Sequence, residues 1–160
     1  MAGSGPWLND REQATWRAFL ALRAKLPAHL ARDLQRHSGL SEADYTILVE
    51  LSEVPEKKLR LGELGARLGW EKTRLSRQFS RMSARGLVRR EDCPGDARGA
   101  FAVLTPKGQD TVATAAPRHV QQVRRWFVDA LTPEQLDAMT AIAAAVVDRL
   151  PEPGSADDDS

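Results

Sequence analysis

The segment spanning residues 61–108 constrains the fold more than any other part of the chain. Its first half repeats large apolar residues every three or four positions, which predicts two short helices that each bury one stripe. The stripes are Leu61, Leu64 and Leu68, followed by Leu75, Phe79 and Met82. Gly69 follows the first stripe and Gly86 follows the second, so we expect a tight turn and a helix end at these positions. The pattern therefore predicts a helix-turn-helix.

The second half of this segment predicts a β-hairpin directly after the second helix. Strands are expected at residues 87–90 and 100–104, and residues 93–99 have the sequence CPGDARG, which is typical of a loop at a hairpin tip. Helix, turn, helix and hairpin in this order predict a winged helix-turn-helix. The expected fold class is mainly α with a small β-hairpin wing, with further helices at both ends of the chain.

The second helix has a polar face opposite its apolar stripe. This face and its margins carry arginine and small hydroxyl residues. Arginine can donate two hydrogen bonds to guanine or pair with a phosphate, and Ser and Thr let a helix approach closely. We therefore expect this helix to enter the major groove of double-stranded DNA, although a solvated face is the alternative for the helix taken alone. The candidate contacts are Lys72, Thr73, Arg74, Ser76, Arg77, Ser80 and Arg81.

The charge of the chain is distributed unevenly. The formal net charge is +1 for the whole chain, but residues 57–98 hold 12 Lys and Arg against 5 Asp and Glu, a net charge of +7. A local excess of positive charge favours a polyanionic partner. A basic segment alone would suit RNA or a membrane surface equally well. Its combination with a helix-turn-helix and a wing makes duplex DNA the better interpretation.

Two segments, ELGARLGWEKTRLSRQFSRMSARGLVRRE and the wing pattern D-x-R followed by AVLTPKG, resemble the MarR (multiple antibiotic resistance regulator) family. The resemblance extends from about Trp16 to Leu150 and includes GLSEADYTILVELSE, which is similar to the second helix of the family. It implies that Thr73 and Arg77 occupy DNA-reading positions. Trp70 stands where many members carry leucine, and we expect it to pack rather than contact a base.

The resemblance also implies that the wing tip contacts DNA. The Asp and Arg of the family's wing correspond to Asp96 and Arg98, and Ala97 stands where the family often has a second arginine. An arginine at a hairpin tip can enter the adjacent minor groove, where the negative potential is strongest. An exposed loop arginine without this role is the alternative for Arg98.

Both ends of the chain predict apolar helices. The first carries Trp16, Phe19, Leu20, Leu26, Leu30 and Leu34, and we expect Pro27 to kink or split it, since an interior proline costs about 3 kcal/mol. Thr105-Pro106 and Thr132-Pro133 predict the starts of two further helices, the longer of which Pro117 is expected to bend.

These terminal helices could form a private core, but the resemblance implies that they interlock with a second copy of the chain in a homodimer. A two-fold dimer sets its two recognition helices roughly 34 Å apart on a pseudo-palindromic operator. We expect four parts: an N-terminal segment and dimerisation helix at residues 1–37, the winged helix-turn-helix at 38–105, C-terminal dimerisation helices at 106–150 and a disordered acidic tail at 151–160.

The resemblance further implies a small effector, often aromatic or lipophilic, bound where the dimer helices meet the DNA-binding lobes. By location, the candidates to line such a pocket are Trp16, His37, Tyr45 and His119. A place in the core or on the surface is the alternative for each of them.

Other classes of function lack a pattern in the sequence. The three histidines stand far apart, the single cysteine cannot form a Cys-x-x-Cys pair, and we find no phosphate-binding Gly-rich loop or nucleophile motif. We therefore expect no metal, no cofactor and no enzymatic activity. For Cys93, close to Arg89 and Arg90, a redox switch is the alternative to an inert surface thiol.

The sequence also predicts where the protein works. The start MAGSGPW does not resemble a signal peptide, no apolar run approaches the ~20 residues of a membrane span, and a single cysteine suits a reducing compartment. The overall prediction is a cytoplasmic, homodimeric transcription regulator, in its expected form a repressor that an effector releases from DNA. The alternatives are a DNA-binding protein without an effector and a winged-helix module that binds a protein partner through its basic face.

Overall fold

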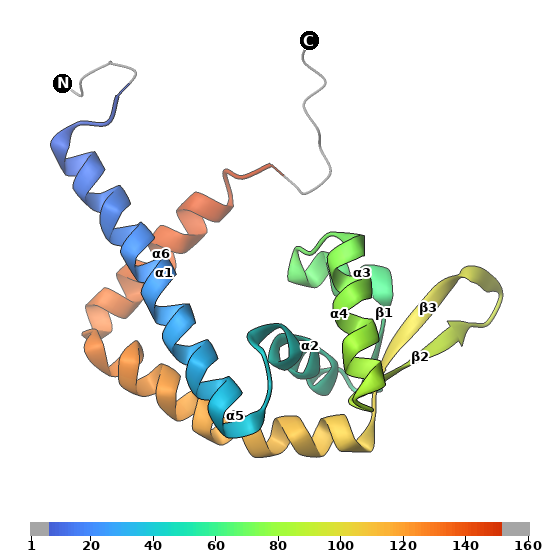
Figure 1. Cartoon of the computed structure of the whole chain (residues 1–160). Helices are drawn as coiled ribbons and strands as arrows, with labels where there is room; N and C mark the ends of the chain where they lie inside the picture. Colours follow the sequence, from blue (N-terminus) through green and yellow to red (C-terminus); the bar gives the residue numbers. More distant parts are fainter. Residues whose placement is uncertain (1–6, 152–160) are drawn as a thin grey trace, which may run out of the picture.

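The computed structural model describes residues 7–151, except for the side chains of residues 96–98. The predicted acidic tail lies outside these residues beyond its first position. The elements, in chain order, are α1 (Asp10–Ser38), α2 (Glu42–Glu53), β1 (Lys58–Arg60), α3 (Leu61–Leu68), α4 (Lys72–Ala84), β2 (Val88–Cys93), β3 (Asp96–Leu104), α5 (Pro106–Trp126), the 3₁₀ helix η1 (Val128–Ala130) and α6 (Pro133–Val147). Figure 1 shows α2, α3, α4 and the sheet as one lobe, with the long helices α1, α5 and α6 extending away from it.

The starts of several helices follow from local capping residues. Ser41 caps α2 and Thr132 caps α6, each in a reciprocal capping box with the residue three positions later. Thr105 caps α5, and Pro106 occupies the first helical position, where its missing N–H has no helical partner to lose. The helix starts predicted at Thr105 and Thr132 are confirmed.

The helix-turn-helix forms as its apolar periodicity predicts. Leu64 of α3 and Leu75, Phe79 and Met82 of α4 are all buried. Gly69 ends α3 with φ at +60°, a left-handed conformation that glycine adopts without steric cost. The stripes pack on the central helix α2, whose Ile47, Leu48 and Leu51 are fully buried.

The two interior prolines do not divide their helices. Of the two expected effects of Pro27, a kink or a split, the split is wrong, because α1 is one helix of 29 residues that includes this proline. A proline removes one backbone hydrogen bond, and the rest of this long helix keeps its own. Leu34, seven residues further on, is buried in the core and holds this end of α1 in place. Helix α5 likewise continues through Pro117 and curves along its length in Figure 1.

The wing belongs to a three-stranded antiparallel sheet of order β1-β3-β2. The sequence did not reveal β1, because three residues are too few to show a strand periodicity. The strand is formed by pairing with β3, where Arg60 faces Phe101. The hairpin loop is also shorter than predicted. Cys93 pairs with Asp96 around Pro94 and Gly95, so residues 96–99 belong to β3 and not to a loop.

Helix α5 leaves the wing at a point of close backbone approach. A Cβ atom on Gly108 would lie 2.1 Å from the carbonyl oxygen of Leu87, so only glycine fits here without a shift of backbone. Thr105 fixes the same junction, since its hydroxyl lies 2.7 Å from the carbonyl oxygen of Gly86. The start of α5 is therefore joined tightly to the end of the helix-turn-helix.

Within residues 7–151, none of the helices combines the length and the apolar character needed to cross a membrane.

Candidate nucleic-acid interface

The outward face of α4 collects the predicted DNA contacts. Because Leu75, Phe79 and Met82 point into the core, the remaining positions of the helix face solvent. All seven candidate side chains on α4 are exposed: Lys72, Thr73, Arg74, Ser76, Arg77, Ser80 and Arg81. In Figure 1, α4 lies beside the base of the β2–β3 hairpin, so helix and wing border one side of the lobe. The geometry is that of a helix available to a DNA groove.

The cations of α4 and its neighbouring elements differ in whether an acidic side chain neutralises them. Arg67 pairs with Glu63 at 2.8 Å, and Arg89 pairs with Glu91. By contrast, Lys72, Arg77 and Arg81 on α4 and Arg90 on β2 form no ion pair with any residue that the structure describes. The uncompensated charge is therefore concentrated on α4 and the adjoining strand, where a phosphate backbone would be attracted.

Trp70 holds one of the candidate arginines. The guanidinium carbon of Arg74 lies 4.1 Å from the centre of the Trp70 ring, and Trp70 itself packs against the core. A cation over an indole face is attracted by the ring quadrupole. The packing predicted for Trp70 is confirmed, and its ring also orients Arg74 at the first turn of α4.

Ser80 of α4 offers small size more than a free hydroxyl donor. The Ser80 hydroxyl donates to the carbonyl oxygen of Ser76 at 2.9 Å, one turn earlier in the same helix. Its oxygen can still accept a hydrogen bond, but its proton is already engaged. Because the serine side chain is short, the helix can approach a DNA groove closely at this position.

A hollow of about 530 Å³ separates α4 from the wing, between α3 and the strands. Its lining includes Trp70, Lys72 and Ser76, which were singled out in the sequence, and Arg90, which was not. The alternation of side chains between the two faces of a strand could have indicated Arg90. It lies two residues after the buried Val88, so both side chains lie on the same face of β2. Asp96 and Arg98 are the first and third residues of β3, but their side chains lie outside the described part of the chain.

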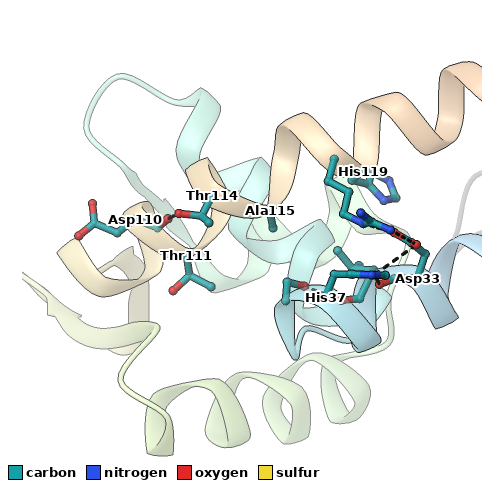
Figure 2. Close-up of a pocket in the computed structure, with 10 residues that line it drawn as sticks. Asp33, His37, Asp110, Thr111, Thr114, Ala115 and His119 are labelled. Atoms are coloured by element: carbon teal, nitrogen blue, oxygen red, sulfur yellow. Dashed lines mark hydrogen bonds and ion pairs between the residues drawn. The ribbon is translucent and has the colours of Figure 1, made fainter.

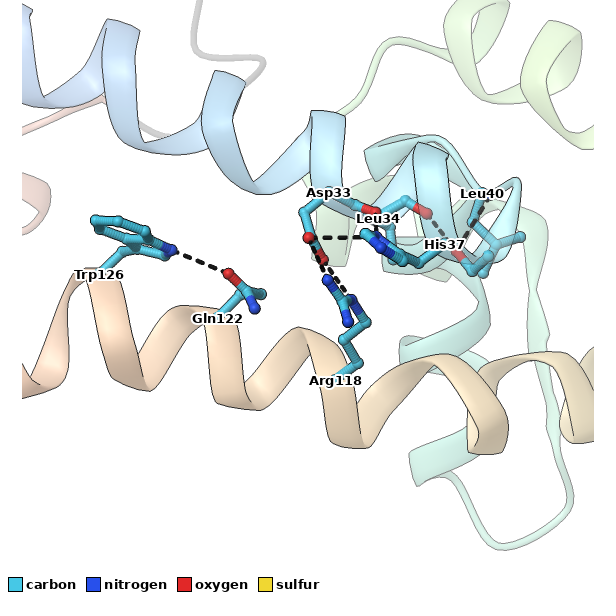
Figure 3. Close-up of polar contacts among 8 residues, drawn as sticks. Asp33, Leu34, His37, Leu40, Arg118, Gln122 and Trp126 are labelled. Carbon is cyan, nitrogen blue, oxygen red and sulfur yellow. Dashed lines mark hydrogen bonds and ion pairs between the residues drawn. The ribbon is translucent and has the colours of Figure 1, made fainter.

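A second site lies between the end of α1 and the first half of α5. It is a cleft of about 400 Å³, shown in Figure 2, whose lining includes Asp33, His37, Thr111, Arg118 and His119. Arg118 donates two hydrogen bonds to the Asp33 carboxylate, at 3.0 Å and 2.9 Å (Figure 3). The Nδ1 atom of His37 lies 2.9 Å from the backbone oxygen of Asp33 and therefore carries a proton there, since a carbonyl oxygen only accepts.

The predicted pocket residues are only partly brought together. His37 and His119 line the cleft, and the Tyr45 ring lies 4.5 Å from the His119 ring. Tyr45 belongs to an adjoining apolar hollow of about 310 Å³ between α1 and α2, which shares Leu34 and His119 with the cleft. Trp16 lies apart from both, 51% exposed and stacked on Phe19 near the start of α1. Its long helix carries it away from the other three.

The pKa values of three side chains in and beside the cleft are shifted by their surroundings. The hydrogen bonds from Arg118 hold the pKa of Asp33 below its ordinary value. Burial lowers the pKa of His119, so the neutral imidazole is favoured, and burial raises the pKa of Tyr45. The cleft and the adjoining hollow together therefore combine a fixed ion pair, a neutral imidazole and a phenol beside apolar side chains.

The remaining candidates for chemistry are accounted for by packing. No group of three or more His, Cys, Asp and Glu side chains capable of holding a metal ion occurs among the described residues. Cys93 is 5% exposed, so the expected surface thiol is in fact buried. It is the last residue of β2 and pairs with Asp96 across the turn at Pro94 and Gly95.

The fold and the basic face of α4 define a DNA-binding regulator with a winged helix-turn-helix. A sequence profile of the MarR family matches residues 38–99. Two solved MarR family transcriptional regulators from Streptomyces coelicolor are similar over nearly their full length. AbsC is 42% identical, with 90% of this chain and 97% of that chain covered and a TM-score of 0.86. Sco3205, solved in complex with DNA, is 40% identical, with 96% and 97% covered and a TM-score of 0.90.

A curated relative gives the same result. The transcriptional regulator HosA of Escherichia coli O111:H- is 32% identical over 63% of this chain and 73% of its own length. The chain belongs to the MarR family of transcription regulators, which bind DNA and are not enzymes.

The stacking of Arg74 on Trp70 leads to a first prediction. Replacing Trp70 with leucine should preserve the apolar packing but release Arg74, and DNA binding should weaken about two- to fivefold, as expected for a partly exposed cation–π contact of ~0.5–1 kcal/mol. Fluorescence anisotropy with a labelled duplex measures the change. Because the effect acts through Arg74, Trp70→Leu should add nothing in an Arg74→Ala background; full additivity would contradict it.

Proposed function

We propose that this protein is a homodimeric transcription repressor that reads a pseudo-palindromic operator with α4 and leaves it when a small effector binds. The observation that carries the proposal is the outward face of α4, where Arg77 and Arg81 have no described acidic partner and small hydroxyl residues lie beside them. Residues 38–105 would bind DNA, and the helices in residues 1–37 and 106–150 would form the dimer.

Uncovered apolar side chains support the dimer. Helix α6 carries no buried residue, and its Ile142 and Val146 are 59% and 57% exposed. Large apolar side chains are also exposed just before α1, on α1 and in the second half of α5, namely Leu8, Trp16, Phe19, Leu20, Leu22, Val120 and Trp126. Apolar surface of this extent on terminal helices is typical of an obligate interface. A second copy would also supply the second recognition helix.

The cleft between α1 and α5 supports an effector site. It joins a polar end, with Arg118 and His119, to the apolar hollow near Tyr45, and this combination suits a small aromatic or lipophilic molecule. Its walls belong to a terminal helix on one side and to the start of α5, which is joined to the wing, on the other. A ligand that binds one spacing of these helices better than another shifts the population of lobe positions.

The proposal is tested by selecting bound duplexes from a random DNA pool with purified protein at ~150 mM salt. A dimeric reader should select a pseudo-palindrome with half-sites about 10 bp apart. Specific binding should persist against an excess of competitor DNA, whereas attraction by charge alone should be lost to the competitor. A pool without a common sequence would contradict the proposal and leave the basic face for non-specific DNA or an acidic protein partner.

The half-buried imidazole of His119 leads to a prediction on pH. Burial lowers its pKa, so between the ordinary value of about 6.5 and the lower folded value only the unfolded chain takes up the proton. The free energy of unfolding should therefore decrease as the pH falls below about 6.5, and this decrease should be smaller in His119→Gln. Urea unfolding at pH 8.0 and 5.5 measures both proteins. Equal pH dependence in the two would contradict the assignment to His119.

A further inference from the structure

One carboxylate is buried against the recognition helix. Asp44 is 3% exposed and is the only charged residue that is buried in the described part of the chain. Its oxygens accept hydrogen bonds from the backbone N–H of Ser41 at 2.9 Å, from Nε2 of Gln78 at 2.7 Å and from Nη1 of Arg85 at 2.6 Å. A buried charge is tolerated at low cost only when it is paired and hydrogen-bonded, and here it is both.

These partners connect two parts of the fold. Asp44 belongs to the first turn of α2, whereas Gln78 lies in the middle of α4 and Arg85 at its C-terminal end. The other arm of Arg85 donates to the backbone oxygen of Gly39, in the joint between α1 and α2, at 3.1 Å. Lys107 of α5 donates to the backbone oxygen of Arg85 at 2.8 Å. The end of α4 is thus tied to α2, to the joint between α1 and α2, and to α5.

The network supplies what the apolar contacts of α4 do not. Burial of Leu75, Phe79 and Met82 decides which face of α4 points inward, but apolar contacts are non-directional, so they restrict small rotations about the helix axis less than hydrogen bonds do. Hydrogen bonds weaken steeply when their angles change, and charge-assisted bonds are the stronger ones. Bonds at Gln78 and at Arg85, which lie two turns apart on α4, oppose both rotation and sliding of the helix.

We propose that Asp44 is a positioning residue for sequence reading, because it sets the rotation of α4 and so the direction in which Arg77 meets a base pair. The same bonds keep Gln78, next to Arg77 in the helix, and Arg85 away from DNA. A glutamine released from Asp44 could pair with adenine. Loss of the carboxylate should therefore change which sequence is read more than how strongly DNA is bound. The inference rests on the proposed sequence-specific function.

The test compares the native chain with Asp44→Asn. The native chain is first tested for selection of a defined operator. If it selects none, the result contradicts the proposed function rather than the role of Asp44. Affinities are then measured for this operator and for a scrambled duplex of equal length and composition. The ratio of the two should fall about tenfold in Asp44→Asn, comparable to the loss of one good base contact, while the affinity for the scrambled duplex changes less than about twofold.

Two control variants separate positioning from stability. Val112→Ala removes part of a buried side chain of α5 that takes no part in the network, and Asp129→Asn removes the same charge from an exposed ion pair with Arg124. Both should keep the native ratio at a temperature where circular dichroism shows each protein folded. Selection from a random pool with Asp44→Asn should yield an altered base preference beside the position that Arg77 reads.

A second variant keeps the test valid if Asp44→Asn does not fold. Arg85→Lys preserves the charge of a side chain that is 43% exposed but cannot reach Asp44 and Gly39 together, and it should lower the ratio by about threefold. An unchanged ratio with an unchanged selected sequence would overturn the proposal. So would equal weakening on both duplexes, because a purely structural role predicts that result.

Discussion

Replacing Ile142 with aspartate should give a folded monomer that binds the selected operator about 10²–10⁴-fold more weakly than the native chain. Ile142 is 59% exposed in the single chain, so the charge would not disturb the core of the protomer. In the proposed dimer it would enter an apolar interface, where an unpaired charge is strongly unfavourable. Loss of the partner also removes the second recognition helix, and the two half-sites would no longer be bound as one ligand.

Analytical ultracentrifugation and fluorescence anisotropy measure the two effects together. Ala141→Asp provides a matched control, since it adds the same charge one residue earlier, on the polar side of α6 near Asp137 and Asp148. This control should remain dimeric and bind the operator. If Ile142→Asp is a dimer of native affinity, α6 does not form the interface, and the dimer would have to be sought on α1 and the second half of α5.

Replacing Arg77 with alanine should cost ~1–3 kcal/mol on the selected operator, roughly 5- to 150-fold in affinity, and relax base preference at one position of each half-site. Arg77 is exposed on the outward face of α4 and has no ion pair with a described residue. Its guanidinium is therefore available to the O6 and N7 atoms of a guanine in the major groove.

A second duplex separates base reading by Arg77 from phosphate binding, and a second arginine serves as the control. Arg67→Ala removes an arginine of α3 that is already paired with Glu63 and Glu50, so its effect should be much smaller. An equal loss for Arg77→Ala on operator and random duplex would reduce Arg77 to a phosphate contact. No loss on either duplex would remove it from the interface.

Local patterns in the sequence were sufficient for the helix-turn-helix and for the reading face. A helix repeats every 3.6 residues, so the positions of Leu75, Phe79 and Met82 also determine which side chains of α4 point outward. Caps act over three or four residues, which is why Thr105 and Thr132 marked the starts of α5 and α6 correctly. Features of this range need no knowledge of the rest of the chain.

Other features depend on residues that meet only in the folded chain. Strand β1 exists because β3 offers it a hydrogen-bonding edge. Cys93 pairs with Asp96 in the hairpin and is buried, although the loop-like sequence around it indicated an exposed thiol. Pro27 stays inside α1 because the helix around it is long and anchored in the core. Of the predicted pocket residues, Trp16 was separated from His119 by the direction of α1.

The charges of the candidate site also depend partly on the local sequence and partly on the tertiary structure. The sequence by itself determined that cations accumulate in residues 57–98 and that α4 carries them outward, because composition and helical period are local properties. Only the tertiary structure decided which cations remain free. Arg85 is engaged by Asp44, which is 41 positions away in the chain, whereas Arg77 meets no described carboxylate. Electrostatic pairing depends on distance in space, and that distance is set by the packing of α2 on α4.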